Sequence, residues 1–181
     1  MRKVGILMPV FSLPSKYGIG TLGKSAYKFI DFLSEAKQDL WQVLPSNPTS
    51  YGDSPYQSFS IYAQNPYFID LELLVKDKLI TKEDLKNAHL ENDSNYIDYG
   101  NIFNNKMALL RKASKNRGLF KSQFAYFKQT NKWVYDYALF MVLKQHHNYK
   151  AWNQWEDKYK YKDEKALKEF YNEHKEDIIS Y

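Results

Sequence analysis

The sequence predicts an α/β chain that begins with a βαβ unit and continues as a long, mostly helical segment. Two short apolar runs, residues 4–13 and 39–45, lie on either side of a stretch with helical periodicity. A strand, a helix and a second strand within about 45 residues are typical of a βαβ unit, whose two strands lie parallel. Beyond residue 75 the apolar residues recur with helical spacing, and no further strand is predicted.

The βαβ unit is predicted from the order of its three parts. The first apolar run, Val4 to Leu13, is closed by Pro14 and predicts a strand that is buried on both faces. The second run, Asp39 to Pro45, predicts the second strand. Between them, residues 24–37 predict an amphipathic helix whose apolar side is formed by Tyr27, Phe29, Ile30, Phe32, Leu33 and Ala36.

Four stretches beyond residue 75 have helical patterns. Thr81 followed by Asp84 matches a capping box and predicts the start of a short helix. The helical period returns in residues 104–115 and 163–178, and residues 132–147 are apolar nearly all round, which predicts a central helix. Two parallel strands cannot close a core of their own. Either the helices cover a small irregular sheet or the chain begins a larger fold, and we favour the second interpretation.

Composition excludes several classes of protein. The net charge of +5 comes from 26 basic and 21 acidic residues, and the lysine-rich tail from Lys144 to Lys175 is interleaved with acids. This mixture favours solvated helix faces and argues against a nucleic-acid partner. The absence of cysteine excludes disulfides and fits a reducing, cytoplasmic location. No apolar segment approaches the ~20 residues needed to cross a membrane, and the four histidines lack metal-ligand spacing, so no metal or cofactor is predicted.

A turn-rich stretch full of aromatic residues follows the second predicted strand. It runs from Ser46 to Asn65, is called the aromatic loop below, and contains the sequence "YGDSPYQSFS" from Tyr51 to Ser60. Turn residues of this kind normally lie at the surface, whereas aromatic rings normally serve a core. The combination predicts a surface site whose function depends on exposed aromatic rings.

Several motifs make the chain resemble the N-terminal third of the 4-α-glucanotransferases, the amylomaltase or disproportionating-enzyme family. The similarity is carried by "SLPSKYGIG" (residues 12–20), "WQVLP" (41–45), "YGDSPYQSFS" (51–60), "NPYFIDL" (65–71), "DYALF" (136–140) and "WNQW" (152–155). The resemblance implies the first βαβ elements of a (β/α)8 TIM barrel plus a mostly helical insertion subdomain. Residues 1–75 would then belong to the catalytic barrel and carry an aromatic glucan-binding loop, and residues 76–181 would form the insertion.

The implied activity is the transfer of α-1,4-glucan segments between maltodextrins. Such enzymes retain anomeric configuration through a covalent glycosyl-enzyme, which requires two carboxylates facing each other across the sugar. In the family these acids lie on later barrel strands, and a whole barrel usually takes about 250 residues. We therefore expect no catalytic residue in this chain and no activity of the chain alone. A catalytic pair of Asp53 and Asp70 is disfavoured, because Asp53 is more simply a turn residue and Asp70 a strand-end residue.

Four substrate-binding residues are expected, three of them implied by the resemblance. Ser54 and Tyr56 correspond to family residues that line the glucan cleft, Tyr51 corresponds to a residue of a second glucan site in some relatives, and Asp53 adds a carboxylate beside them. Aromatic rings cover the apolar faces of sugars, while hydroxyls and carboxylates satisfy their polar rims.

The competing interpretation is that these rings fill gaps between the barrel and the insertion. For Tyr56 we favour sugar binding, for Tyr51 the two interpretations stay open, and a core role is favoured for Phe59, Tyr62, Tyr67, Phe68, Trp152 and Trp155.

Two departures from the family pattern stand out. Ser46 and Asn47 replace a more usual hydrophobic residue and glycine, and Phe103 replaces a tyrosine that some relatives place beside the second glucan site. The expected partners are a maltodextrin and the remainder of the barrel, with no nucleic acid and no membrane. The alternative to the enzyme fragment is a self-contained, non-catalytic carbohydrate-binding or interaction module.

Overall fold

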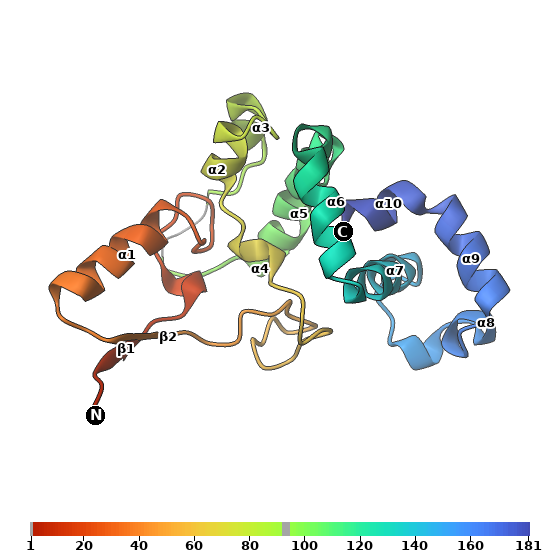
Figure 1. Ribbon diagram of the computed structural model, residues 1–181, viewed down its shortest axis with the longest axis horizontal. Helices are drawn as coiled ribbons and strands as arrows, with labels where there is room; N and C mark the ends of the chain where they lie inside the picture. Colours follow the sequence, from red (N-terminus) through yellow and green to blue (C-terminus); the bar gives the residue numbers. More distant parts are fainter. Residues whose placement is uncertain (1, 92–94) are drawn as a thin grey trace. The chain divides into compact units, whose positions relative to one another are not determined.

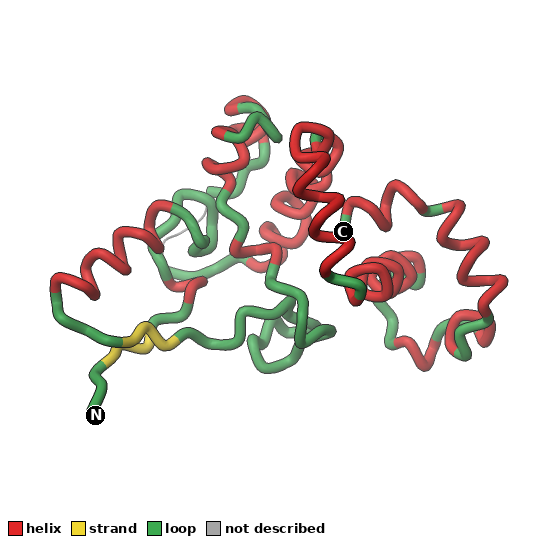
Figure 2. Tube along the Cα trace, in the orientation of Figure 1, coloured by secondary structure: helices red, strands yellow, loops and turns green. Residues whose placement is uncertain are grey.

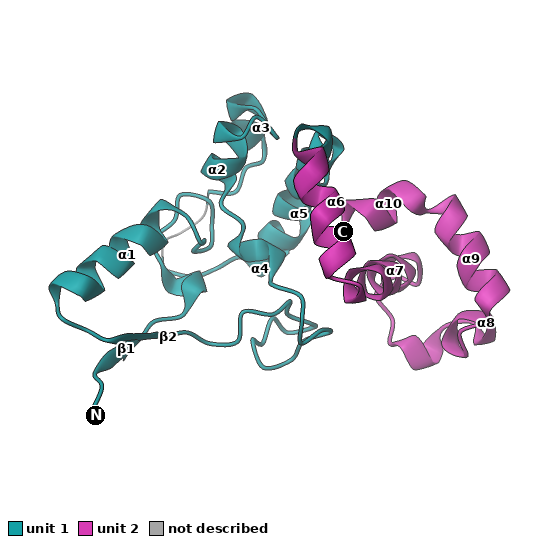
Figure 3. Cartoon of the chain, viewed as in Figure 1, with its two compact units in different colours: residues 1–119 teal, residues 120–181 magenta. Residues whose placement is uncertain are grey.

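The computed structural model describes residues 2–91 and 95–181 of the chain. It divides into two compact units, unit 1 comprising Met1–Leu119 and unit 2 comprising Phe120–Tyr181 (Figure 3). This division falls elsewhere than the boundary between residues 75 and 76 that separates the predicted barrel part from the predicted insertion. The assignment of residues 76–181 to an insertion remains a prediction, but residues 76–119 pack as part of unit 1.

Unit 1 begins with the predicted βαβ unit. Strand β1 (Gly5–Leu7) pairs in parallel with β2 (Leu40–Gln42), and helix α1 (Lys24–Glu35) connects them (Figure 1). Gly5 faces Leu40, and a Cβ atom at Gly5 would lie only 2.7 Å from the Leu40 carbonyl oxygen. A glycine therefore permits the close pairing of the two strands at this position.

The strands are shorter and more exposed than the sequence predicts. Residues 10–12 form a 3-10 turn instead of continuing β1, because Pro9 has no N–H to donate and its carbonyl accepts from the Ser12 amide (Figure 2). Trp41 packs against Phe29 of α1, whereas Leu40, on the opposite face, is 49% exposed. The prediction of strands buried on both faces is wrong for the described residues, because α1 covers only one face of this two-stranded sheet.

Helix α1 buries only part of its apolar side. Ala26 and Leu33 are buried and Phe29 packs on the core, but the other large apolar side chains of the helix, Tyr27, Ile30 and Phe32, are exposed. Together with Val4, Leu7, Leu40 and Val43 they leave an extensive apolar surface around the two strands. A surface of this kind is typical of an interface.

Beyond the aromatic loop, unit 1 is mostly helical. Helices α2 (Leu71–Lys76), α3 (Lys82–Asn87), α4 (Tyr99–Asn101) and α5 (Met107–Lys115) follow, with a π-helical turn at Ile102–Lys106 and 3-10 turns at Pro66–Phe68 and Arg117–Phe120. The predicted capping box of α3 is confirmed, since Thr81 and Asp84 each accept a hydrogen bond from the other's amide at 3.0 Å. The core of the unit joins α1, α2, α5 and several turns and connecting segments: Val10, Leu13, Ile19, Ala26, Tyr67, Phe68, Leu71, Ile80, Leu90, Ile102, Leu109 and Ala113.

Unit 2 is built around the predicted central helix. Helices α6 (Lys121–Thr130), α7 (Trp133–His146), α8 (Asp157–Lys160), α9 (Glu164–Glu173) and α10 (Lys175–Ser180) are joined by short turns, one of them the 3-10 turn Trp152–Gln154. Its core consists of Ala138, Val142 and Leu143 of α7 with Trp155, Phe170 and Ile178. The single helix predicted over residues 163–178 is two helices, because the chain leaves helical geometry at His174.

Two side chains of unit 2 differ from expectation. Trp155 is buried as predicted, but Trp152 is 57% exposed and does not belong to the core. Lys144 opens the lysine-rich tail that predicts a solvated face, yet it is buried and donates to the carbonyls of Tyr149 and Lys150. Within residues 2–91 and 95–181 no helix has the length and apolarity needed to cross a membrane.

Candidate functional site

The tip of the aromatic loop, residues 49–58, is held by its own backbone. Thr49 and Ser58 form an antiparallel bridge, and the Ser50 amide donates to the Gln57 carbonyl at 3.0 Å. Inside the bridge are two successive turns, closed by bonds from Asp53 to Ser50 and from Gln57 to Ser54, both 3.1 Å long. The loop is thus a small hairpin-like structure with most of its shape set locally.

The sequence explains the sharp reversal at the tip. Gly52 has a φ of +85° and Asp53 a φ of +53°, a left-handed backbone that glycine and aspartate adopt at low cost. Asp53 is therefore a turn residue, as predicted. Its carboxylate accepts from the Thr49 hydroxyl at 3.4 Å, and the next residue, Ser54, closes a turn through its side chain, since its Oγ accepts from the Tyr56 amide.

The turns present two aromatic rings to solvent. Tyr51 is 98% exposed and Tyr56 is 72% exposed, while Asp53 and Ser54 between them are half-buried. A core role for either tyrosine is excluded within unit 1, since neither belongs to its apolar cluster. Two rings and two hydrogen-bonding side chains within six residues can bind a ligand that has both apolar faces and hydroxyl groups.

The four rings predicted to fill gaps divide into two kinds. Tyr67 and Phe68 are buried in the core, which confirms the prediction for them, and Phe59 is half-buried. Tyr62 is 63% exposed, so its predicted core role is wrong. Residues 58–62 satisfy their polar backbone through serine side chains, with Ser60 Oγ accepting from the Tyr62 amide, and this local turn leaves the ring outside the core.

The two ends of the loop are joined by the residues that depart from the family pattern. The Asn47 side chain donates to the Ala63 carbonyl at 2.9 Å, the Ser46 hydroxyl donates to Gln64 Oε1 at 2.7 Å, and the Asn65 amide donates to the Ser46 carbonyl at 2.7 Å. Ser46 and Asn47 therefore close the base of the loop.

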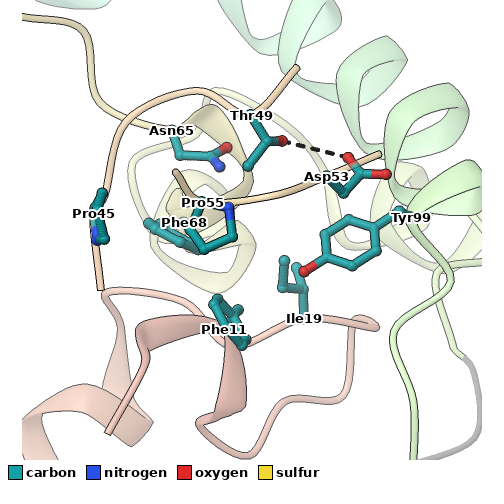
Figure 4. Close-up of a pocket in the computed structure, with 9 residues that line it drawn as sticks. All are labelled: Phe11, Ile19, Pro45, Thr49, Asp53, Pro55, Asn65, Phe68 and Tyr99. Atoms are coloured by element: carbon teal, nitrogen blue, oxygen red, sulfur yellow. Dashed lines mark hydrogen bonds between the residues drawn. The ribbon is translucent and has the colours of Figure 1, made fainter. Parts of the chain in front are cut away.

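A cavity of about 10 Å³ lies behind the tip, between the loop and the N-terminal part of unit 1 (Figure 4). This volume suits one water molecule. Burial raises the pKa of Asp53, which the hydrogen bond from Thr49 partly offsets. Burial also raises the pKa of Tyr99, with a smaller contribution from the charge of Asp53. The lining residues are Phe11, Ile19, Pro45, Thr49, Asp53, Pro55, Asn65, Phe68 and Tyr99.

The far end of the loop meets a buried lysine. Lys106 is 0% exposed, and its ammonium donates to the Tyr67 carbonyl at 2.5 Å. Burial lowers the pKa of Lys106 to about 7, and the charge of Asp70 acts in the opposite direction. Asp70 is not a strand-end residue: it is the N-cap of α2, accepting from the Leu73 amide at 3.0 Å and from the Thr21 hydroxyl at 2.7 Å.

The geometry equips this region for binding. Asp70 is occupied as a helix cap and Asp53 as part of a turn, so neither acid stands free for catalysis. Among the residues that the structure describes, no three His, Cys, Asp or Glu side chains are grouped to hold a metal ion.

Comparison with known proteins identifies the family. The family model of the 4-α-glucanotransferases matches residues 8–181 of the chain. The chain belongs to the 4-α-glucanotransferase family. A 4-α-glucanotransferase of Clostridium butyricum is 48% identical over 176 residues, which are 94% of this chain and 36% of that protein. A 4-α-glucanotransferase of Aquifex aeolicus is 44% identical over 95% of this chain and 35% of its own length.

A solved structure agrees with these relatives. The amylomaltase of Streptococcus agalactiae, determined in complex with acarbose, has a TM-score of 0.92 and 40% identity over 99% of this chain and 37% of that protein. The chain thus spans about a third of the length of the 4-α-glucanotransferases it matches.

Two residues of the site escape prediction from the sequence. Tyr99, which lines the cavity, lies four residues before Phe103, but nothing in the local sequence distinguishes it. Lys106 looks like an ordinary helix-surface lysine. A signal for its burial exists in the apolar residues that surround it at helical spacing, Ile102, Leu109 and Leu110.

Proposed function

We propose that the chain forms the N-terminal portion of a 4-α-glucanotransferase and supplies part of its glucan-binding surface. The observation that carries the proposal is the pair of exposed rings, Tyr51 and Tyr56, on a tip whose backbone is closed by its own hydrogen bonds. A preformed aromatic surface binds a sugar without the entropic cost of ordering a loop. Ser54 and Asp53 lie between the rings and would pair with sugar hydroxyls.

The position of the loop supports the same proposal. It follows the carboxyl end of β2, and in parallel barrels the loops after the strand ends form the active-site face. We propose that β1, α1 and β2 are the first elements of a (β/α)8 barrel. The apolar surface around Val4, Leu7 and Leu40 is then the place where further barrel elements pack.

The proposed reaction is transfer of α-1,4-glucan segments by a retaining, two-carboxylate mechanism. The acids of unit 1 that lie near the loop, Asp53 and Asp70, are engaged in structural hydrogen bonds. We therefore propose that the catalytic carboxylates come from outside this chain, and that the 181-residue chain does not convert maltotriose into longer maltodextrins. Transfer by the purified chain that is lost on replacing Asp53 would overturn this assignment.

Ligand binding tests the aromatic surface directly. We expect maltoheptaose to bind the chain weakly, in the millimolar range, because only part of a cleft is present. Replacing Tyr56 by alanine should weaken binding about tenfold or more, since one stacked ring is lost. Titration followed by NMR measures this effect.

Tyr161→Ala is the matched control. Tyr161 of unit 2 is 72% exposed, the same fraction as Tyr56, and lies outside the loop. Equal losses for the two variants would show that exposed tyrosines bind sugar nonspecifically and would contradict the proposed site. Tight binding by the wild-type chain would instead favour the self-contained module.

Sedimentation separates the enzyme portion from a module. The exposed side chains at Leu7 and Leu40 predict that the isolated chain self-associates. A monomer with a single cooperative melting transition would favour the non-catalytic module.

A further inference from the structure

We propose that Lys106 is a positioning residue for the aromatic loop: its buried side-chain nitrogen donates to the Tyr67 carbonyl and thereby fixes the far end of the loop. The inference rests on the proposed function of the loop in so far as it concerns glucan affinity. The positioning itself is a property of the fold and can be measured without a ligand.

The contact of Lys106 joins two distant segments. Lys106 lies 39 residues after Tyr67, at the end of the π-helical turn Ile102–Lys106, and its side chain is fully buried. A charged side chain in an apolar core is costly unless it makes strong hydrogen bonds. The presence of a lysine at this position therefore indicates that the hydrogen bond to Tyr67 has a specific role.

The acceptor of this bond belongs to the turn that ends the loop. Tyr67 lies in the 3-10 turn Pro66–Phe68, and its amide donates to Asn65 Oδ1 at 2.9 Å. The Asn65 amide in turn donates to the Ser46 carbonyl, which closes the base of the loop. A chain of three hydrogen bonds thus runs from Lys106 through Tyr67 and Asn65 to Ser46.

Tyr99 adds a second support from the same segment. Its ring lies 6.4 Å from the ring of Tyr67, measured between centroids, and it lines the cavity behind the tip together with Asp53 (Figure 4). The segment from Tyr99 to Lys106 therefore contacts the loop both at its far end and behind its tip. A π-helical turn is a rare local geometry that recurs at functional sites, and Lys106 is its last residue.

Two substitutions separate the hydrogen bond from the rest of the side chain. Lys106→Met keeps an apolar stem but removes the donor to Tyr67, whereas Lys106→Gln removes the charge and keeps a donor. We expect Lys106→Met to speed amide hydrogen exchange about tenfold at Asn65, because one net hydrogen bond is lost. Lys106→Gln should leave this rate within about threefold of the wild-type value. Lys144→Met, which removes the buried lysine of unit 2, is the control and should leave the Asn65 amide unchanged.

Glucan affinity supplies the second readout. Lys106→Met should weaken maltoheptaose binding several-fold under conditions in which unit 1 stays folded, and Lys106→Gln should restore most of it. A purely structural role would lower stability in both variants and leave the affinity of the folded molecules unchanged. If the wild-type chain does not bind maltoheptaose, the proposed function fails, but the exchange rate at Asn65 still decides the positioning role.

The proposal is overturned if Lys106→Met leaves exchange at Asn65 unchanged in folded protein, or if Lys106→Gln speeds it as much. Should Lys106→Met fail to fold, Tyr99→Leu replaces it, because it removes the ring contact with Tyr67 and retains the lysine bond. We then expect a smaller acceleration at Asn65, about threefold. The positioning role would be excluded if Tyr99→Leu left the exchange rate at Asn65 unchanged and Lys106→Gln raised that rate.

Discussion

Unit 1 and unit 2 each bury a lysine. The two lysines differ in how far along the sequence their hydrogen-bond acceptors lie. Lys106 of unit 1 donates to a carbonyl 39 residues away, whereas Lys144 of unit 2 donates to carbonyls 5 and 6 residues further on. Lys144 therefore holds the turn that directly follows its own helix. Lys106 instead ties the segment after α4 to the end of the aromatic loop.

The apolar cores of the two units also differ in how far apart in the sequence their members lie. The apolar cluster of unit 1 joins elements from Val10 to Ala113, so it depends on contacts between distant segments. The cluster of unit 2 runs from Ala138 to Ile178 and includes Phe170, whose ring lies 4.2 Å from that of His174 four residues later. The comparison indicates that unit 1 presents a loop on a scaffold made from distant parts, while unit 2 is a more local helical packing.

The largest effect is expected from opening either core. Phe170→Ala removes a fully buried ring from unit 2 and should cost about 3–5 kcal/mol of its stability, and Leu71→Ala in unit 1 should cost about 2–5 kcal/mol. Trp41 is the single tryptophan of unit 1, while Trp133, Trp152 and Trp155 belong to unit 2. Denaturation of variants that keep tryptophan in only one unit reports each transition separately.

Because each cluster contains residues of one unit only, Phe170→Ala should lower the transition of unit 2 and leave that of Trp41 in place. Leu71→Ala should do the reverse. A shift of both transitions by the same amount in either variant would show that the two cores melt as one, and the comparison of two separate units would fail.

The second-largest expected effect is the pH dependence of the stability of unit 1, which arises from its buried Lys106. The folded-state pKa of Lys106 is lowered to about 7 from an ordinary value of 10.5. Between these values the unfolded chain binds a proton that the folded chain lacks, so the stability of unit 1 rises with pH across this window. From pH 7 to 9 we expect a gain on the order of 2 kcal/mol. Urea denaturation followed through Trp41 measures it.

Lys106→Met provides the control, since it removes the titrating group and should flatten the dependence. Burial also lowers the pKa of Lys144, which contacts two carbonyls, so unit 2 should gain in the same direction. An equal slope in Lys106→Met and in the wild type would assign the pH dependence to another group.

Prediction from the sequence succeeds where the pattern is local. The βαβ unit, the capping box at Thr81 and the central helix α7 follow from spacing within a few turns of chain, and the structure contains all three. The surface character of Tyr51 and Tyr56 also follows locally, because Gly52 and Asp53 force a turn that carries both rings outward.

Prediction fails where distant residues decide the outcome. The exposure of Leu40 depends on which elements cover the second face of the sheet, and the burial of Lys106 depends on a carbonyl 39 residues away. Tyr62 is exposed because serine side chains complete its backbone hydrogen bonds, an alternative that hydrophobicity alone does not reveal. The role of Asn47 follows from the approach of Ala63, which no local pattern encodes.

The smallest effect compares how the two units begin their helices. Helix α3 of unit 1 starts with a reciprocal pair of bonds between Thr81 and Asp84, whereas α9 of unit 2 starts with one bond, from the Ala166 amide to Asp163. Thr81→Ala removes one bond of its pair and should destabilise helix α3 by about 1 kcal/mol, and Asp163→Ala should destabilise helix α9 by a similar amount.

The two variants should nevertheless differ in how far the change spreads. Helix α3 contributes no buried residue, so loss of its cap should mainly fray the helix and speed amide exchange at Leu85. Helix α9 carries the buried ring of Phe170, so fraying at Asp163 should also lower the global transition of unit 2. Equal global shifts in the two variants would show that α3, despite its exposed position, is as tightly coupled to its core as α9 is.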